Sequence, residues 1–119
     1  MDEELLRRLD RVKEFKTRLM IMGFSGWPDA GKVSSLSIKY LVSSLKAERI
    51  GDLKTSRCYD LTSTRPLVAV SKGVLRDFRL PSNDLYLWTS GDHEKAFLIL
   101  MGSEPNMNWE EYTGQILSI

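Results

Sequence analysis

The segment with the clearest potential for chemistry runs from Gly26 to Lys32 and has the pattern Gly-x-x-x-x-Gly-Lys. In a phosphate-binding P-loop this pattern is followed by serine or threonine. Backbone N–H groups surround the phosphates, the lysine neutralises them and the hydroxyl holds magnesium. Here Val33 follows the lysine, and Ser34, which carries the next hydroxyl, lies about 100° further round a helix. Neither residue is placed to hold magnesium. An ATP- or anion-binding, ligase-like enzyme in which Gly26, Gly31 and Lys32 bind phosphate is therefore kept as the alternative interpretation.

The helix predicted after this loop offers a second explanation for the lysine. Projected at about 100° per residue, Lys32, Lys39 and Lys46 fall on nearly one line, and serines flank that line. A polar stripe of this kind is typical of a helix face that meets solvent. Lys32 is then explained without a phosphate.

Other catalytic or metal-binding chemistry has little support in the sequence. Cys58 is the only cysteine and His93 the only histidine, so an internal disulfide and a cysteine-based metal cluster are both ruled out. No motif pairs the two residues as nucleophile and base. We therefore assign no catalytic residue, no metal and no cofactor, and we expect a non-enzymatic protein.

Charge and hydropathy limit the classes of partner. The 17 basic side chains nearly balance the 16 acidic ones, which leaves a net charge of +1 and no field suited to nucleic acid. Charges interrupt the N-terminus, so it lacks a secretory signal, and no apolar stretch reaches the roughly 18 residues that span a bilayer. We expect a cytoplasmic protein that binds neither nucleic acid nor membrane.

Hydrophobic periodicity predicts helices alternating with strands. Helices are expected over residues 3–16 and 30–47, and from Asn108 onward. The predicted strands are residues 19–24, 49–53, 85–88 and 96–101, and residues 67–70 and 74–80 read as a β-hairpin. The pattern indicates an α/β fold of three layers, with a mostly parallel sheet, flanking helices and an inserted hairpin. Because no strand follows the last helix, we expect one domain over residues 1–119 that is short at its C-terminus.

The predicted helix over residues 30–47 carries two apolar edges, more than a helix on one face of a sheet needs. One edge consists of Val33, Leu36 and Tyr40. The other consists of Ile38, Leu41, Val42 and Leu45. One edge can cover the sheet, and we take the edge that contains Ile38 as the candidate interface for a partner protein. A helix wedged within a single core is the alternative.

Four segments occur together in the order found in one known family. They are Gly-Phe-Ser-Gly-Trp-Pro-Asp-Ala-Gly at residues 23–31, Tyr-Asp-Leu-Thr-Ser-Thr-Arg-Pro at 59–66, Gly-Ser-Glu-Pro-Asn at 102–106, and Trp-x-x-Tyr at 109–112. With these segments, residues 18–116 resemble the proteasome assembly chaperone two family. The resemblance implies a three-layer α/β domain that acts through protein–protein contacts, as a homo- or hetero-oligomer, and proteasome α subunits are the partners of characterised members.

Two features depart from the family's pattern. Members are typically much longer than this chain. The chain also ends in Leu-Ser-Ile, without the hydrophobic-Tyr-any motif with which proteasome-binding members can end. The resemblance therefore gives no support for docking to a proteasome through the tail.

The matched residues define a candidate loop cluster. Its members are Gly26, Trp27, Pro28, Asp29, Gly31, Arg65, Pro66, Glu104, Pro105 and Trp109. Because open α/β sheets gather their loops at the carboxyl ends of strands, residues 26–29 and 102–106 should lie close together. Asp29 is expected to cap the helix, and Arg65 could pair with Asp29, Asp60 or Glu104. A polar clasp that holds the loops and a small-anion pocket both remain open as interpretations.

Overall fold

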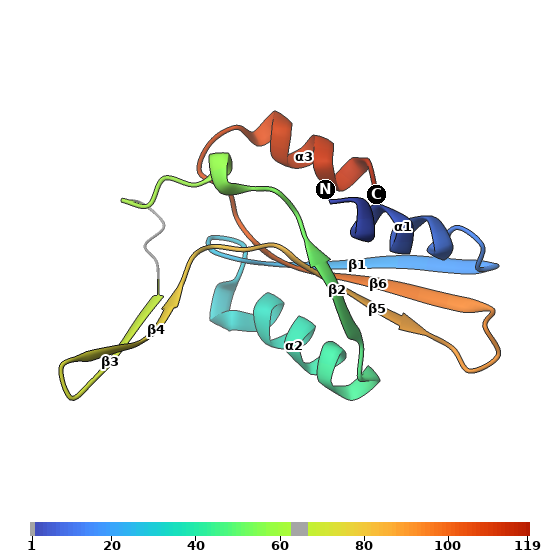
Figure 1. The fold of residues 1–119 in the computed structure, drawn as a ribbon, viewed down its shortest axis with the longest axis horizontal. Helices are drawn as coiled ribbons and strands as arrows, with labels where there is room; N and C mark the ends of the chain where they lie inside the picture. Colours follow the sequence, from blue (N-terminus) through green and yellow to red (C-terminus); the bar gives the residue numbers. More distant parts are fainter. Residues whose placement is uncertain (1, 63–66) are drawn as a thin grey trace. The chain divides into compact units, whose positions relative to one another are not determined.

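The computed structural model describes residues 2–62 and 67–119, and its backbone divides into two compact units. The first unit comprises residues 1–54 and 83–104, which include the main sheet and two helices. The second comprises residues 55–82 and 105–119, which include a hairpin and the last helix. Figure 1 shows the fold with its elements labelled.

The first unit begins with helix α1, Glu3–Val12. Asp2 caps it, because its carboxylate accepts a hydrogen bond of 2.7 Å from the Leu5 N–H. Leu5, Leu9 and Val12 form its buried stripe, and Leu5 packs over Gly51, where an added Cβ would stand 3.2 Å from Leu5 Cδ1. The helix therefore ends four residues before the predicted limit, although its predicted apolar stripe is the one that packs.

The sheet of the first unit has four strands: β1 (Thr17–Ser25), β2 (Glu48–Asp52), β5 (Asp84–Thr89) and β6 (Lys95–Ser103). Their order is β1-β6-β5-β2. Strands β1 and β6 are parallel, whereas the β6–β5 and β5–β2 pairs are antiparallel. The α/β class with flanking helices is confirmed, but the sheet is mixed rather than mostly parallel. The reason is the short connection of residues 90–94 between β5 and β6, since a parallel crossover needs about a dozen residues or more.

Helix α2, Val33–Leu45, and α1 lie on opposite sides of this sheet (Figure 1). Helix α2 packs against β1 and β6. It is shorter than the predicted span of residues 30–47, because Lys32 (φ 58°) and Lys46 (φ 53°) adopt left-handed conformations immediately before and after it. A separate 3₁₀ turn, Ala30–Lys32, precedes the helix.

The core of the first unit is built on the two central strands. Leu85 of β5 and Ala96, Ile99 and Leu100 of β6 are all 0 % exposed. The buried Asn83 precedes β5, and its Oδ1 accepts a hydrogen bond of 3.1 Å from the Ser103 N–H. Asn83 thereby fixes the end of β6, the strand that leads into the candidate loop cluster.

The second unit contains a hairpin and a helix. Strands β3 (Leu67–Ser71) and β4 (Val74–Arg79) pair antiparallel, as the sequence predicts for these residues. Helix α3 is Trp109–Leu117. The 3₁₀ turn Ser56–Cys58 contacts this helix. The Asn106 N–H, in the segment before the helix, donates to the Cys58 carbonyl at 2.9 Å. In the described part of the chain, no helix has the length and hydropathy needed to cross a membrane.

Cys58 and Tyr112 are among the buried residues of the second unit, with exposed fractions of 0 % and 4 %. Burial raises the pKa of the Cys58 thiol, and it also raises the pKa of the Tyr112 hydroxyl. A thiol with a raised pKa carries little thiolate, so Cys58 fits a packing role better than a nucleophilic one.

Candidate functional site

The loop after β1 meets the end of β6 because of the parallel register of the two strands. Ser25 is paired with Ser103, so the residues that follow, Gly26 and Glu104, leave the same edge of the sheet side by side. The Glu104 N–H donates to the Ser25 carbonyl at 3.0 Å. In return, the Trp27 N–H donates to Glu104 Oε2 at 2.8 Å. A charge-assisted hydrogen bond therefore fixes the backbone of the loop to the neighbouring strand end.

Gly26 makes this arrangement possible. Its φ of 113° lies in the region that favours glycine, and a Cβ added here would come within 2.8 Å of Glu104 Oε2. The next turn follows at once, since the Asp29 N–H donates to the Gly26 carbonyl at 3.1 Å. The first glycine of the motif thus allows both the turn and the close approach of Glu104.

Asp29 stabilises the start of α2 from outside the helix. The residue at the N-cap position is Lys32, whose left-handed backbone places no side chain on the first amides. The Asp29 carboxylate takes that role instead and accepts a hydrogen bond of 2.9 Å from the Ser35 N–H. Hydrogen bonds from Ser35, together with the nearby Lys32 charge, hold the pKa of Asp29 below its ordinary value of 3.8.

Replacing Asp29 with asparagine is expected to remove an acid-sensitive part of the stability. Because the folded-state pKa is lowered, the ionised carboxylate stabilises the fold above the ordinary value of 3.8, and this contribution is lost as the pH falls through the lower folded pKa. Asparagine still accepts the Ser35 hydrogen bond but does not titrate. Thermal unfolding near pH 7 and near pH 3 should show a smaller acid-induced loss in Asp29→Asn than in the wild type. Glu14→Gln, which changes an exposed carboxylate, is the control. Equal losses in the wild type and Asp29→Asn would rule out this role.

The contacts of the loop fit a phosphate site poorly. The Trp27 amide, which a phosphate would need, is already bound to Glu104. The Ser34 hydroxyl, the nearest hydroxyl to a magnesium position, instead accepts a hydrogen bond of 2.8 Å from the Phe24 N–H. Within residues 2–62 and 67–119, no group of three or more His, Cys, Asp or Glu side chains is placed to hold a metal ion. The described contacts of the Gly26–Lys32 loop thus include a carboxylate of the same chain, that of Glu104.

Other members of the candidate loop cluster lie either outside the described residues or in the second unit. Arg65 and Pro66 lie outside the described residues, so the proposed pairing of Arg65 stays a prediction. Pro105 and Trp109 belong to the second unit, where Pro105 is buried and Trp109 is 51 % exposed. The structure therefore brings together Gly26, Trp27 and Glu104. Ser34 and Ser35, which hold the loop and the helix start, were missed because serines in a helix usually face solvent.

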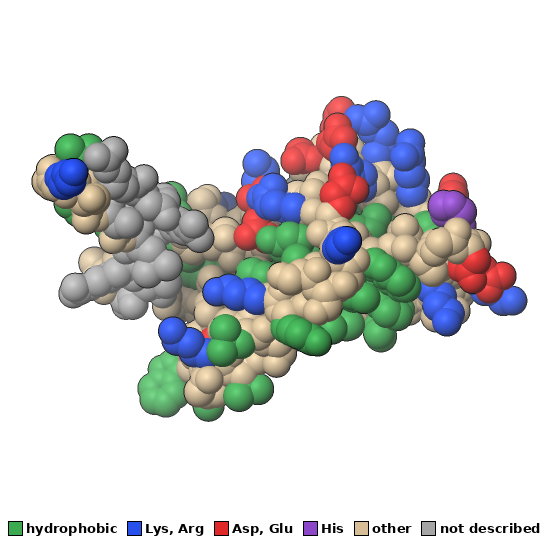
Figure 2. Space-filling model, turned by 90° about the horizontal axis from the view of Figure 1, so that it is seen from below, with side chains coloured by type: hydrophobic (Ala, Val, Ile, Leu, Met, Phe, Trp, Pro, Cys, Tyr) green, Lys and Arg blue, Asp and Glu red, His purple; other side chains and the backbone are tan. Residues whose placement is uncertain are grey.

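The two apolar edges of α2 are exchanged relative to the prediction. Ile38 is 3 % exposed and packs against Gly23 of β1, so it faces the sheet and is not available to a partner. Leu41, Val42 and Leu45 beside it are half-buried. The other edge is exposed, with Val33 at 68 %, Leu36 at 55 % and Tyr40 at 72 %. Figure 2 shows this side of the molecule, where hydrophobic side chains lie at the surface around α2.

Comparison with known proteins identifies the family. The family model described as PAC2 family matches residues 23–119. A PAC2 family protein from Streptomyces avermitilis has 27 % identity and a TM-score of 0.71, over 85 % of this chain and 43 % of that one. A proteasome-assembly chaperone homologue from Mycobacterium tuberculosis has 25 % identity and a TM-score of 0.76, over 84 % and 42 % of the two chains.

A protein of unknown function from Corynebacterium glutamicum, 20 % identical, shares the fold with a TM-score of 0.71 over 88 % of this chain and 38 % of that one. No curated protein matches the sequence. The chain thus spans less than half the length of these solved structures. The match over residues 23–119 includes the loop motif and the end of β6. The chain belongs to the PAC2 family.

Proposed function

We propose that this protein is a non-enzymatic, assembly-chaperone-type module that binds other proteins. The residues that carry the proposal are Val33, Leu36 and Tyr40 on one edge of α2, with Trp27 in the loop that precedes the helix, and we call them the α2 surface. Trp27 is 92 % exposed and Tyr40 is 72 % exposed. Exposed apolar side chains that recur along one edge of a helix, as Val33, Leu36 and Tyr40 do, mark interaction sites more often than single ones do.

The composition of the α2 surface suits protein binding. Tryptophan and tyrosine are enriched among the residues that contribute most to binding, because they bury large areas at a small cost in side-chain entropy. Leu36 and Val33 add aliphatic area from the same helix. Helix faces of this kind commonly pack against a groove or a second helix of the partner.

The loop motif gains a role in this proposal. The hydrogen bond between the Trp27 N–H and Glu104 fixes the backbone while the indole ring stays almost fully exposed. An anchor residue on a fixed backbone loses less conformational freedom on binding than one on a mobile loop. The Gly-Trp-Pro-Asp segment would then serve to present Trp27, and Glu104 would act as a positioning residue.

Two kinds of partner are candidates. One similar structure is a proteasome-assembly chaperone homologue, so proteasome α subunits are the first candidates. The second candidate is another copy of this chain, because oligomers built by one exposed apolar patch are commonly symmetric dimers. Both fit a protein that works in the cytoplasm.

The test is to measure binding with variants of the α2 surface. Trp27→Ala and Leu36→Lys are each expected to weaken the complex with a purified α subunit from the same organism, or the self-association of the chain, by about 30-fold. Sedimentation velocity over a range of concentrations measures both. Leu80→Lys is the matched control, because Leu80 is 53 % exposed and Leu36 is 55 % exposed.

Different binding results distinguish the proposed function from its alternatives. Loss of binding in Trp27→Ala and Leu36→Lys, with retention in Leu80→Lys, supports the proposal. Equal weakening in Leu36→Lys and Leu80→Lys would show that the added charge, wherever it is placed, is responsible. A chain that binds neither an α subunit nor a second copy would contradict the proposed function.

A further inference from the structure

A second candidate site lies on the side of the sheet that carries α1, opposite the side covered by α2 (Figure 1). It is a pocket of about 390 Å³ between α1, β2 and β5. Its lining residues are Glu4, Arg7, Arg8, Arg11, Phe15, Glu48, Leu87 and Thr89. All of them belong to the first unit. The volume reaches the lower part of the range of small-molecule sites, but the pocket is open, because most of its lining residues, Arg11 among them, are exposed.

Two of the three arginines that line the pocket already pair with carboxylates. Arg8 donates to Glu48 at 2.9 Å and to Glu4 at 3.4 Å. Arg7 lies 3.8 Å from the other oxygen of Glu4. The hydrogen bond to Glu48 is the main cause that raises the pKa of Arg8. These contacts balance both carboxylates of the pocket against two guanidinium groups.

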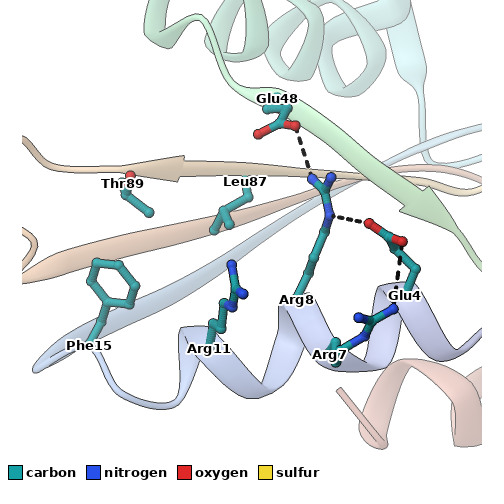
Figure 3. Close-up of a pocket in the computed structure, with 8 residues that line it drawn as sticks. All are labelled: Glu4, Arg7, Arg8, Arg11, Phe15, Glu48, Leu87 and Thr89. Carbon is teal, nitrogen blue, oxygen red and sulfur yellow. Dashed lines mark hydrogen bonds and ion pairs between the residues drawn. The ribbon is translucent and has the colours of Figure 1, made fainter.

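Arg11 is the remaining cation. No side-chain hydrogen bond or ion pair joins Arg11 to any residue in the ranges 2–62 and 67–119. Figure 3 shows its side chain extending from α1 toward Leu87 of β5, with Phe15 on one side and Arg8 on the other. The pocket therefore presents one uncompensated positive charge next to an aromatic ring and an aliphatic side chain.

These features define the chemistry of a ligand. A guanidinium binds a carboxylate through two parallel N–H···O bonds. Phe15 and Leu87 offer apolar contacts to the rest of the molecule. Because the lining carries a single excess charge, a monoanion suits it better than a phosphate dianion, which the nearby Glu4 and Glu48 would repel.

We propose that this pocket binds a small carboxylic acid with an aromatic or branched aliphatic group. The Arg11 guanidinium holds the carboxylate, and Phe15 and Leu87 contact the apolar group. Arg8, fixed by Glu4 and Glu48, forms the wall beside Arg11. The site is separate from the α2 surface and does not depend on the proposed function.

The test uses 3-phenylpropionate as the probe and follows the amide signals of Leu87 and Thr89 by NMR. For an open site of this size we expect a dissociation constant on the order of 1 mM. Arg11→Met should weaken binding by about tenfold or more, since a hydrogen bond to a charged group is lost. Arg11→Lys, which keeps the charge but not the two parallel donors, should bind with intermediate affinity. Arg57→Met, which removes an exposed arginine of the second unit, is the control and should bind as the wild type does.

Two further ligands test the assigned chemistry. The neutral 3-phenylpropionamide should bind at least about tenfold more weakly than the acid, and phenyl phosphate should also bind more weakly. Unchanged binding in Arg11→Met, equal binding of the amide, tighter binding of phenyl phosphate, or no binding of the acid at about 10 mM would each overturn the proposal. Leu36→Lys, which alters the α2 surface, should leave the affinity for 3-phenylpropionate unchanged, so the two proposals fail independently.

Discussion

Replacing Gly23 with valine is expected to lower the free energy of unfolding by about 3 kcal/mol. Gly23 lies in β1 under α2, and a Cβ at this position would overlap Ile38 Cγ1 and stand 3.1 Å from the Ser34 carbonyl oxygen. Neither neighbour can move easily, because Ile38 is buried and Ser34 is part of the helix backbone. The helix would have to shift away from the sheet. Urea unfolding followed by circular dichroism measures the loss.

Two control variants distinguish the steric overlap with Ile38 from a general effect of valine on stability. Gly91 has no atoms within 4 Å of an added Cβ, so Gly91→Val should change stability by less than about 1 kcal/mol. The double variant Gly23→Val/Ile38→Ala should be more stable than the sum of the two single losses predicts, by about 1 kcal/mol or more. Strict additivity of the two substitutions would mean that Gly23 and Ile38 do not share this contact.

Replacing Gly26 with alanine is expected to cost about 2 kcal/mol, from a strained backbone and from the displacement of Glu104. The φ of 113° is unfavourable for any residue with a Cβ, and the new methyl group would lie 3.0 Å from Glu104 Cβ. Glu104 can yield only by giving up its 2.8 Å hydrogen bond to the Trp27 N–H. Thermal unfolding measures the loss, and quenching of Trp27 fluorescence in a background without the other tryptophans reports the change in the loop.

Two comparisons identify the causes of the Gly26 effect. Gly31 has a φ of 60° and open space around it, so Gly31→Ala should cost only about 1 kcal/mol of backbone strain. In a Glu104→Ala background the 2.8 Å approach to Oε2 is absent and only the 3.0 Å contact with Cβ remains, so Gly26→Ala should cost less than in the wild type. A cost for Gly26→Ala that is the same in both backgrounds would show that displacement of the Glu104 carboxylate does not contribute.

Much of the fold follows from the sequence, because local patterns report local structure. The apolar stripe of Leu5, Leu9 and Val12 predicts α1, and the run before Gly102 predicts the central strand β6. The glycine turn at residues 71–73 predicts the β3–β4 hairpin. Among the element bounds, errors concern the ends of helices, where Lys32 and Lys46 take left-handed conformations that propensity assigns mainly to glycine and asparagine.

Strand direction illustrates the limit of local patterns. A continuous apolar run such as β6 indicates burial on both faces, which is typical of parallel sheets. Burial alone does not give direction, and β6 is parallel to β1 but antiparallel to β5. The short turn at residues 90–94 decides the second pairing. The length of a connection was therefore a better guide to direction than the composition of the strand.

The candidate site was predictable in part. The family motif and the rule that loops gather at strand ends point to Gly26 and Glu104 as neighbours. The sequence does not reveal which groups bind one another, because a carboxylate can accept from a side chain or from a backbone amide. In the structure Glu104 binds the backbone of Trp27, and Asp29 binds that of Ser35.

The sequence by itself determined the family, the α/β class and most of the elements, since these depend on motifs and on the spacing of apolar residues. Only the tertiary structure decided which edge of α2 faces the sheet. Both edges are apolar, so the pattern within the helix cannot choose between them. The choice depends on Gly23 in another element, whose missing side chain leaves room for Ile38. Val33, Leu36 and Tyr40 are consequently exposed.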